Sequence, residues 1–181
     1  MSKSLFILYL LLCVDTVFAE TIIYLHGRII EDQGTQPVHE RFGLYDYQST
    51  IEALESDGAT VISEVRDRGT KAYEYAKDII EQIETLIEDG ESPENITVVG
   101  FSKGGSIAIF VSELLDRPDA NFVFLAACAD WISSSPELTV VGNIFSIYED
   151  SDELAGSCEP ESIANITIRR FDGAGTWKFL D

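Results

Sequence analysis

The chain has 181 residues, of which 32 are acidic and 12 are lysine or arginine, so its formal net charge is −20 and its pI is near 4.2. A surface this acidic repels phosphate backbones and anionic lipid headgroups. The composition therefore argues against nucleic acid and membrane surfaces as partners.

The first 19 residues have the composition of a signal peptide. Lys3 supplies a short basic start, residues 5–13 form an apolar run, and Ala19 ends a small-residue cleavage site. The apolar run is shorter than the roughly 20 residues that span a bilayer, which argues against a membrane anchor. We expect export to the periplasm or the extracellular space, without membrane insertion once the leader is removed. The mature part, residues 20–181, suits one domain with one core.

Near-continuous apolar runs rich in β-branched residues alternate along the chain with segments of helical periodicity. Such runs are typical of strands covered on both faces, and hence of a parallel sheet. The runs occupy residues 21–25, 59–63, 96–100, 122–126, 144–148 and 166–170, and helices are expected at 45–56, 73–88 and 105–116. The sequence predicts an α/β fold with three αβα layers around a mostly parallel six-stranded sheet. Ligands bind such sheets beyond the carboxyl ends of the strands.

The stretch Gly100-Phe101-Ser102-Lys103-Gly104 lies where the third of these strands meets a predicted helix. This context matches the G-x-S-x-G nucleophile elbow, in which a sharp turn presents a serine hydroxyl above the sheet. The free amides at the start of the following helix suit a developing oxyanion. Ser102 is therefore the candidate nucleophile for acyl transfer, and the alternative is a glycine-rich turn without chemistry.

The first predicted strand ends in His26-Gly27-Arg28. A His-Gly pair after an early strand is a familiar source of oxyanion-hole amides in serine hydrolases of this architecture. We expect one donor from the backbone of Gly27 or Arg28 and the other from that of Lys103. For the His26 side chain the favoured role is to brace the turn.

The segment after the fifth predicted strand is rich in acidic residues. A carboxylate just past a strand end can orient a catalytic histidine, and Asp152 is preferred to Asp150 for this role. The alternatives are solvated turn residues or a cation site, although the spacing does not fit the twelve-residue calcium loop.

Cysteine use is sparse. Cys13 lies in the expected leader, so the exported product keeps Cys128 and Cys158. Both follow the carboxyl ends of successive strands, and an oxidising compartment permits their pairing. Two buried thiols remain an open alternative.

These segments together resemble a small exported bacterial α/β-hydrolase of the lidless sort, with Leu-His-Gly-Arg-Ile-Ile-Glu near its start. The resemblance implies a Ser-Asp-His triad in that chain order, with Ser102 as nucleophile and Asp152 as acid. The position at which the family carries its histidine holds Thr176, and the sequence stops at Asp181 before the family's final helix. A threonine hydroxyl cannot accept the serine proton near neutral pH. Loss of a triad base costs on the order of 10⁴ to 10⁶ in turnover.

Three explanations of the missing base are open. His39 in the loop after the first strand is a candidate surrogate base, and Lys103 is a weaker candidate because adjacent side chains at a tight turn point apart. The most economical explanation is a truncated or frameshifted gene model.

The expected function is that of a serine esterase or acyl hydrolase with an incomplete triad, acting on a small-molecule ester or acyl substrate. The alternatives are a catalytically inactive ligand-binding pseudoenzyme and a misfolded fragment. No cofactor and no metal is implied, because the sequence has no phosphate-binding loop, dinucleotide fingerprint or Cys/His ligand set with metal spacing.

Overall fold

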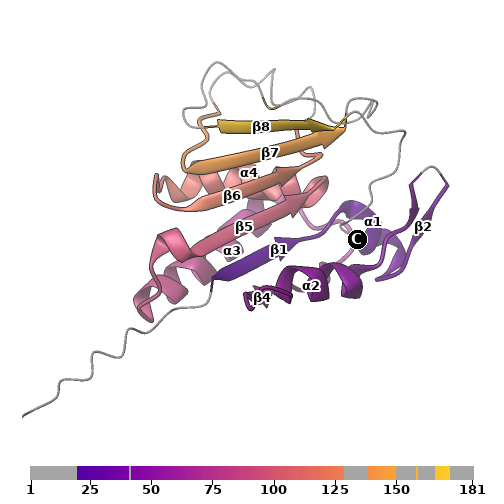
Figure 1. Ribbon diagram of the computed structural model, residues 1–181, viewed down its shortest axis with the longest axis horizontal. Helices are drawn as coiled ribbons and strands as arrows, with labels where there is room; N and C mark the ends of the chain where they lie inside the picture. Colours follow the sequence, from indigo (N-terminus) through magenta and orange to yellow (C-terminus); the bar gives the residue numbers. More distant parts are fainter. Residues whose placement is uncertain (1–19, 41, 129–137, 150–157, 159–165, 172–181) are drawn as a thin grey trace, which may run out of the picture.

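A computed structural model of the protein describes residues 20–40, 42–128, 138–149, 158 and 166–171 (Figure 1). The expected signal peptide and the positions of Asp152 and Thr176 lie outside the described residues. In the described part of the chain, none of the helices combines the length and apolar character that crossing a membrane requires.

The central sheet contains six strands in the order β4-β1-β5-β6-β7-β8, and every neighbouring pair is parallel. The order places β1 and β5, which are separated by about 70 residues of sequence, side by side within the sheet. The strands are β1 (Thr21–Leu25), β4 (Thr60–Ile62), β5 (Ile96–Phe101), β6 (Asn121–Leu125), β7 (Asn143–Glu149) and β8 (Ile166–Phe171). The predicted parallel sheet is confirmed, and each expected run matches a strand to within one residue at either end.

The predicted helices are also present, as α2 (Tyr47–Glu55), α3 (Ala72–Glu88) and α4 (Lys103–Leu115). Asp46 caps α2 by accepting a hydrogen bond from the Ser49 amide at 3.1 Å. Helix α3 buries a stripe that includes Ala76, Ile79 and Ile83, whose spacing of three and four residues places them on one face.

Four short elements were not predicted: α1 (Arg28–Gln33), η1 (Pro93–Asn95), and the antiparallel pair β2 (Val38–His39) and β3 (Gly43–Leu44). Helix α1 has six residues and the strands two each. Segments of this length are too short for hydrophobic periodicity to reveal.

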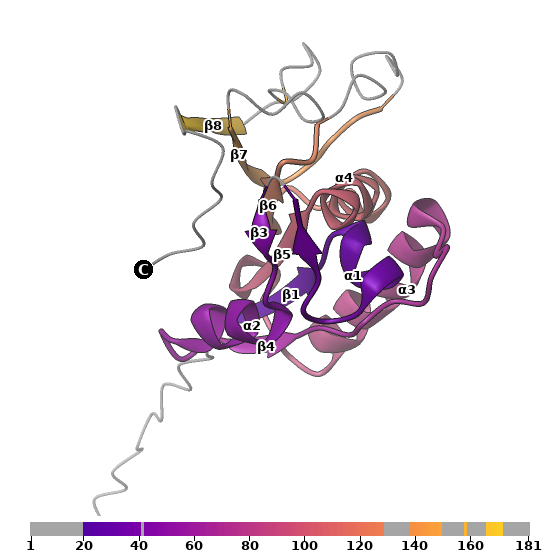
Figure 2. The ribbon, with the colours of Figure 1, turned by 90° about the vertical axis from the view of Figure 1, so that its right-hand side faces the viewer.

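Helices cover both faces of the sheet, with α3 and α4 on one side and α2 on the other (Figure 2). The side chains of β1 divide between the two layers because successive residues of a strand point to opposite faces. Ile23 and Leu25 join the core beneath α3 and α4, whereas Ile22 and Tyr24 join the core on the α2 side. The three-layer arrangement is therefore confirmed.

The pairing of β1 with β5 determines where the predicted site residues meet. Leu25 lies opposite Gly100 in this register. Because both strands run in the same direction, the turn after β1 and the turn after β5 emerge together at the carboxyl edge of the sheet.

Candidate active site

Ser102 occupies the turn between β5 and α4 in a strained backbone conformation. Its φ is 52° and its ψ is −115°, a combination that residues with a side chain rarely adopt and that costs of order 1–3 kcal/mol. The conformation is held by the Ser102 amide, which donates to the Leu125 carbonyl at 2.9 Å, and by the Ser102 carbonyl, which accepts from the Ser106 amide at 3.0 Å. The Ser102 side chain is exposed and makes no capping hydrogen bond to α4. The turn thus presents the hydroxyl to solvent.

Glycines make this tight approach of helix and strands geometrically feasible. A Cβ at Gly104 would overlap the carbonyl of Leu25, and one at Gly100 would overlap the carbonyl of Gly104. A Cβ at Gly105 would overlap the side chain of Ala127. The first turn of α4 therefore lies directly against the ends of β1 and β6.

The turn after β1 lies beside the serine. A Cβ added to Gly27 would lie 2.9 Å from the Phe101 ring and 3.6 Å from Cβ of Ser102. Gly27 is the N-cap residue of α1 and Arg28 is the first residue of this helix. The first amides of an α-helix have no partner within the helix. The structure therefore brings Gly27, Arg28, Ser102 and Lys103 to one place.

The side chain of Tyr45 belongs to the core on the α2 side of the sheet and lies close to the site. Burial raises the pKa of Tyr45, while hydrogen bonding with the Tyr24 hydroxyl and the backbone of Gly27 acts in the opposite direction. The ring of Tyr45 also stacks on Phe101, with 5.5 Å between ring centroids. Tyr45 thus contacts both turns that flank Ser102.

The imidazole of His26 is fully buried and braces the turn after β1. Its Nε2 accepts from the Arg66 amide at 2.9 Å, which leaves the proton on Nδ1 to donate to the Gly27 carbonyl at 2.9 Å. The Arg66 guanidinium also donates to the His26 carbonyl. Burial, together with the nearby Arg66 charge, lowers the pKa of His26 to about 4. Both ring nitrogens have partners, so the ring acts as a structural brace.

This shifted pKa predicts a pH dependence of stability. The unfolded chain, with an ordinary histidine pKa of 6.5, binds the proton more readily than the folded chain, whose pKa is about 4. The contribution of neutral His26 is therefore complete above about pH 6.5 and is lost as the pH falls toward 4, amounting to about 3 kcal/mol. Urea unfolding of the wild type and of His26→Gln at about pH 7 and about pH 4 measures this loss of unfolding free energy. An equal loss of stability in both proteins would contradict the assignment, because carboxylate titration is common to both.

A buried charge network lies next to the site. The carboxylate of Glu31 on α1 accepts from Nε of Arg66 at 3.0 Å and from Nζ of Lys103. The side chains of Glu31 and Arg66 are each only 1% exposed. Because the Lys103 ammonium donates to Glu31, it is not placed as a proton acceptor for Ser102. Sequence reasoning missed this network, and its only local signal was an acidic residue that directly follows two isoleucines, Ile29-Ile30-Glu31.

The structure does not test the two candidates for the remaining catalytic roles. His39 lies on β2, in the two-stranded sheet that is separate from the central sheet, where it is exposed and its ring stacks on Phe42 with 4.8 Å between centroids. Asp152, the candidate acid, is outside the described residues. Both assignments stay predictions.

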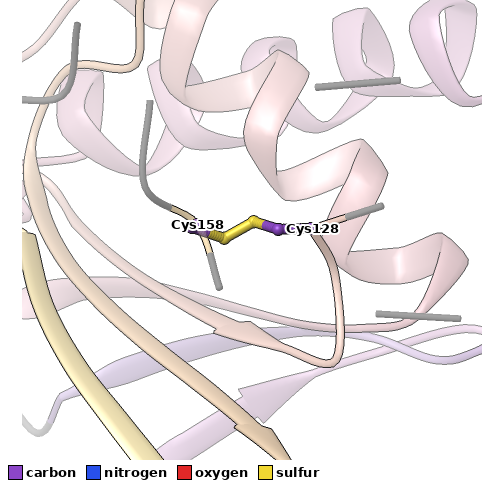
Figure 3. Close-up of a disulfide and its surroundings, with 2 residues drawn as sticks. All are labelled: Cys128 and Cys158. Carbon is purple, nitrogen blue, oxygen red and sulfur yellow. A yellow bond between two sulfur atoms is a disulfide. The ribbon is translucent and has the colours of Figure 1, made fainter. Parts of the chain in front are cut away.

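Cys128 and Cys158 form a disulfide (Figure 3). Their Cα atoms are 5.2 Å apart, and both residues are buried. The structure thus decides between the two alternatives that the sequence left open. Cys128 follows Ala127, which contacts Gly105 in the first turn of α4. The disulfide therefore links the segment after β7 to the residues that pack against the first turn of α4.

No metal centre is formed within the ranges that the structure describes, since no three His, Cys, Asp or Glu side chains gather there in a manner that suits one. A pocket of about 300 Å³ lies between β1, β4 and α3. Its lining contains none of the predicted site residues. The lining residues are Ile23, Tyr24, Leu25, Ile62, Ser63, Glu64, Tyr75, Asp78, Ile79 and Gln82.

Comparison with solved structures identifies the fold. SOBER1 of Arabidopsis thaliana superimposes with a TM-score of 0.58 at 15% sequence identity, over 85% of this chain and 89% of SOBER1. XC6422 of Xanthomonas campestris, a member of the α/β serine hydrolases without a lid, superimposes with a TM-score of 0.53 at 14% identity, over 86% of this chain and 73% of its own. The chain has an α/β-hydrolase fold. No protein-family model matches the sequence, and no curated protein matches it. In this α/β-hydrolase fold, the turn after β5 is the position of Ser102.

Proposed function

We propose that the protein is a serine acyl hydrolase that acts on small-molecule esters or related acyl bonds, with Ser102 as nucleophile and slow turnover. The observation that carries the proposal is the backbone of Ser102, which has a positive φ between β5 and α4 and an exposed side chain. A glycine would adopt this backbone conformation without strain. The presence of a strained serine instead favours a functional role for its side chain.

In the proposed reaction, Oγ of Ser102 attacks the carbonyl carbon of the substrate and its proton passes to solvent water, since neither His26 nor Lys103 is placed to accept it. The carbonyl oxygen becomes negative and accepts hydrogen bonds from backbone amides. The leaving group departs as an alcohol once it receives a proton, and water then hydrolyses the acyl-enzyme. We assign the amides to Lys103 and Arg28. Arg28 is preferred to Gly27 because it is the first residue of α1, and the first amides of a helix have no partner within the helix.

The rate of turnover depends on the group that accepts the Ser102 proton. The sequence contains two histidines: His26 is committed to Arg66 and Gly27, and His39 lies on the separate β2-β3 sheet. With Asp152 as the proposed acid and Thr176 at the family's histidine position, turnover is expected to be about 10⁴ to 10⁶ below that of a complete triad. The oxyanion amides and substrate binding would supply what remains.

The same observation favours a second candidate, a ligand-binding protein that keeps the site without turnover. A bound ester, acid or peptide would then place its carbonyl at the amides of Arg28 and Lys103. This candidate differs from the first in having no reactive serine.

A fluorophosphonate probe distinguishes the two candidates. We expect slow labelling of the wild type that reaches one probe per protein, and none of Ser102→Ala, since Oγ of Ser102 is the proposed nucleophile. Ser106→Ala, one turn further along α4, is the matched control and is expected to be labelled fully. Absence of labelling together with saturable binding of an ester analogue would favour the binding protein instead.

We further propose that the protein is exported as one domain, residues 20–181, after removal of residues 1–19. The apolar leader supports this proposal, and so does the disulfide between Cys128 and Cys158, because disulfides persist mainly in oxidising compartments.

A further inference from the structure

We propose that Glu31 is a positioning residue for the oxyanion amides, an inference that rests on the acyl-transfer function proposed above. The two assigned amides come from different turns, that of Arg28 after β1 and that of Lys103 after β5. Both must lie about 3 Å from one developing oxyanion to stabilise it. The relative placement of the two turns therefore controls the rate.

The Glu31 carboxylate connects α1 to the elbow. Glu31 lies on the same six-residue helix as Arg28, and its Oε2 accepts from Nζ of Lys103. The Lys103 side chain is 19% exposed, whereas that of Glu31 is 1% exposed. The residue whose amide is assigned to the oxyanion is thus anchored through its own side chain to the helix that carries the other amide.

The second carboxylate oxygen connects the same group to the turn after β1. Oε1 of Glu31 accepts from Nε of Arg66 at 3.0 Å, and Arg66 in turn donates to the carbonyl of His26 and, through its amide, to the His26 ring. One buried group thereby spans residues from three distant parts of the sequence, and moving either turn would break one of its contacts.

Stability alone is a weak reason for this arrangement. Replacing buried ion pairs by apolar residues is often neutral or stabilising, because desolvation offsets the attraction between the charges. Hydrogen-bonded charges in a dry environment nevertheless have defined directions, which suits a positioning role. The neighbouring pairs of Asp32 with Arg28 and Arg68 are more exposed, with Asp32 at 26% and both arginines above 70%. Exposed pairs of this kind contribute little, so Asp32 provides a matched comparison on the same helix.

The test is the kinetics of fluorophosphonate labelling at Ser102, separated into probe binding (KI) and the covalent step (kinact). Glu31→Gln and Lys103→Met are each expected to lower kinact by about 10- to 100-fold, with KI within about twofold and full labelling at completion. The double variant should be no slower than the slower single variant, because both changes remove one link. Lys103→Arg, which keeps a cation of similar reach, should recover most of the rate, and Asp32→Asn should leave it unchanged.

The outcomes separate the positioning role from the function on which it rests. A merely structural defect would lower the final stoichiometry of labelling and would leave kinact of the folded fraction at the wild-type value, which would overturn the positioning role. An unchanged kinact in both Glu31→Gln and Lys103→Met would also overturn it while leaving Ser102 as the nucleophile. Should Glu31→Gln fail to fold, Lys103→Met decides, because it leaves the Glu31–Arg66 pair in place. A wild type without labelling at Ser102 would overturn both proposals.

Discussion

Gly104→Ala is expected to lower the free energy of unfolding by about 4 kcal/mol. The new Cβ would overlap the Leu25 carbonyl, and the His26 carbonyl lies 2.8 Å from the same position. Both obstacles are backbone atoms of the interior strand β1 and of the turn that follows it, so relief requires α4 to move away from the sheet. Within an ordinary helix the same change would stabilise the protein by up to about 1 kcal/mol through the backbone entropy of glycine. Whether Gly104→Ala lowers or raises the free energy of unfolding therefore tests whether the first turn of α4 contacts β1.

Urea unfolding of the purified variant measures this effect. Ser106→Ala in the same helical turn is the control and is expected to change stability by less than about 1 kcal/mol. A stabilised Gly104→Ala protein would contradict the close contact between the elbow and β1.

Removal of the disulfide is expected to cost about 3.5 kcal/mol. The bridge joins residues separated by 30 positions, and the loss follows from the greater freedom that the unfolded chain gains when a loop of this length is opened. The double variant Cys128→Ser/Cys158→Ser should show the full loss in thermal or urea unfolding. Dithiothreitol supplies the control, since it should destabilise the wild type and leave the double variant unaffected. Equal stability of the oxidised wild type and the double variant would mean that the two sulfurs are not joined in solution.

The regular elements could be predicted because their signals are local. A β-branched apolar run such as Ile96-Thr97-Val98-Val99 favours a strand wherever it lies, and the apolar spacing within residues 72–88 favours a helix. The short elements α1, β2 and β3 escaped prediction because two to six residues cannot establish a period.

The candidate site was predictable only in part. The glycines around Ser102 indicate a tight turn because no larger residue fits there, and the positive φ of Ser102 agrees with that prediction. The pairing of Cys128 with Cys158 remained open, because it depends on how two segments 30 positions apart pack against each other.

The sequence by itself determined the class of fold and the position of the exposed serine, since both follow from patterns within a few neighbouring residues. Only the tertiary structure decided that Glu31 meets Lys103 and Arg66, that His26 is buried as a neutral brace, and that the ring of Tyr45 stacks on Phe101. These contacts join residues up to 72 positions apart. The register of β1 against β5 and the exclusion of water bring such residues together. Neither property can be predicted from a few neighbouring residues.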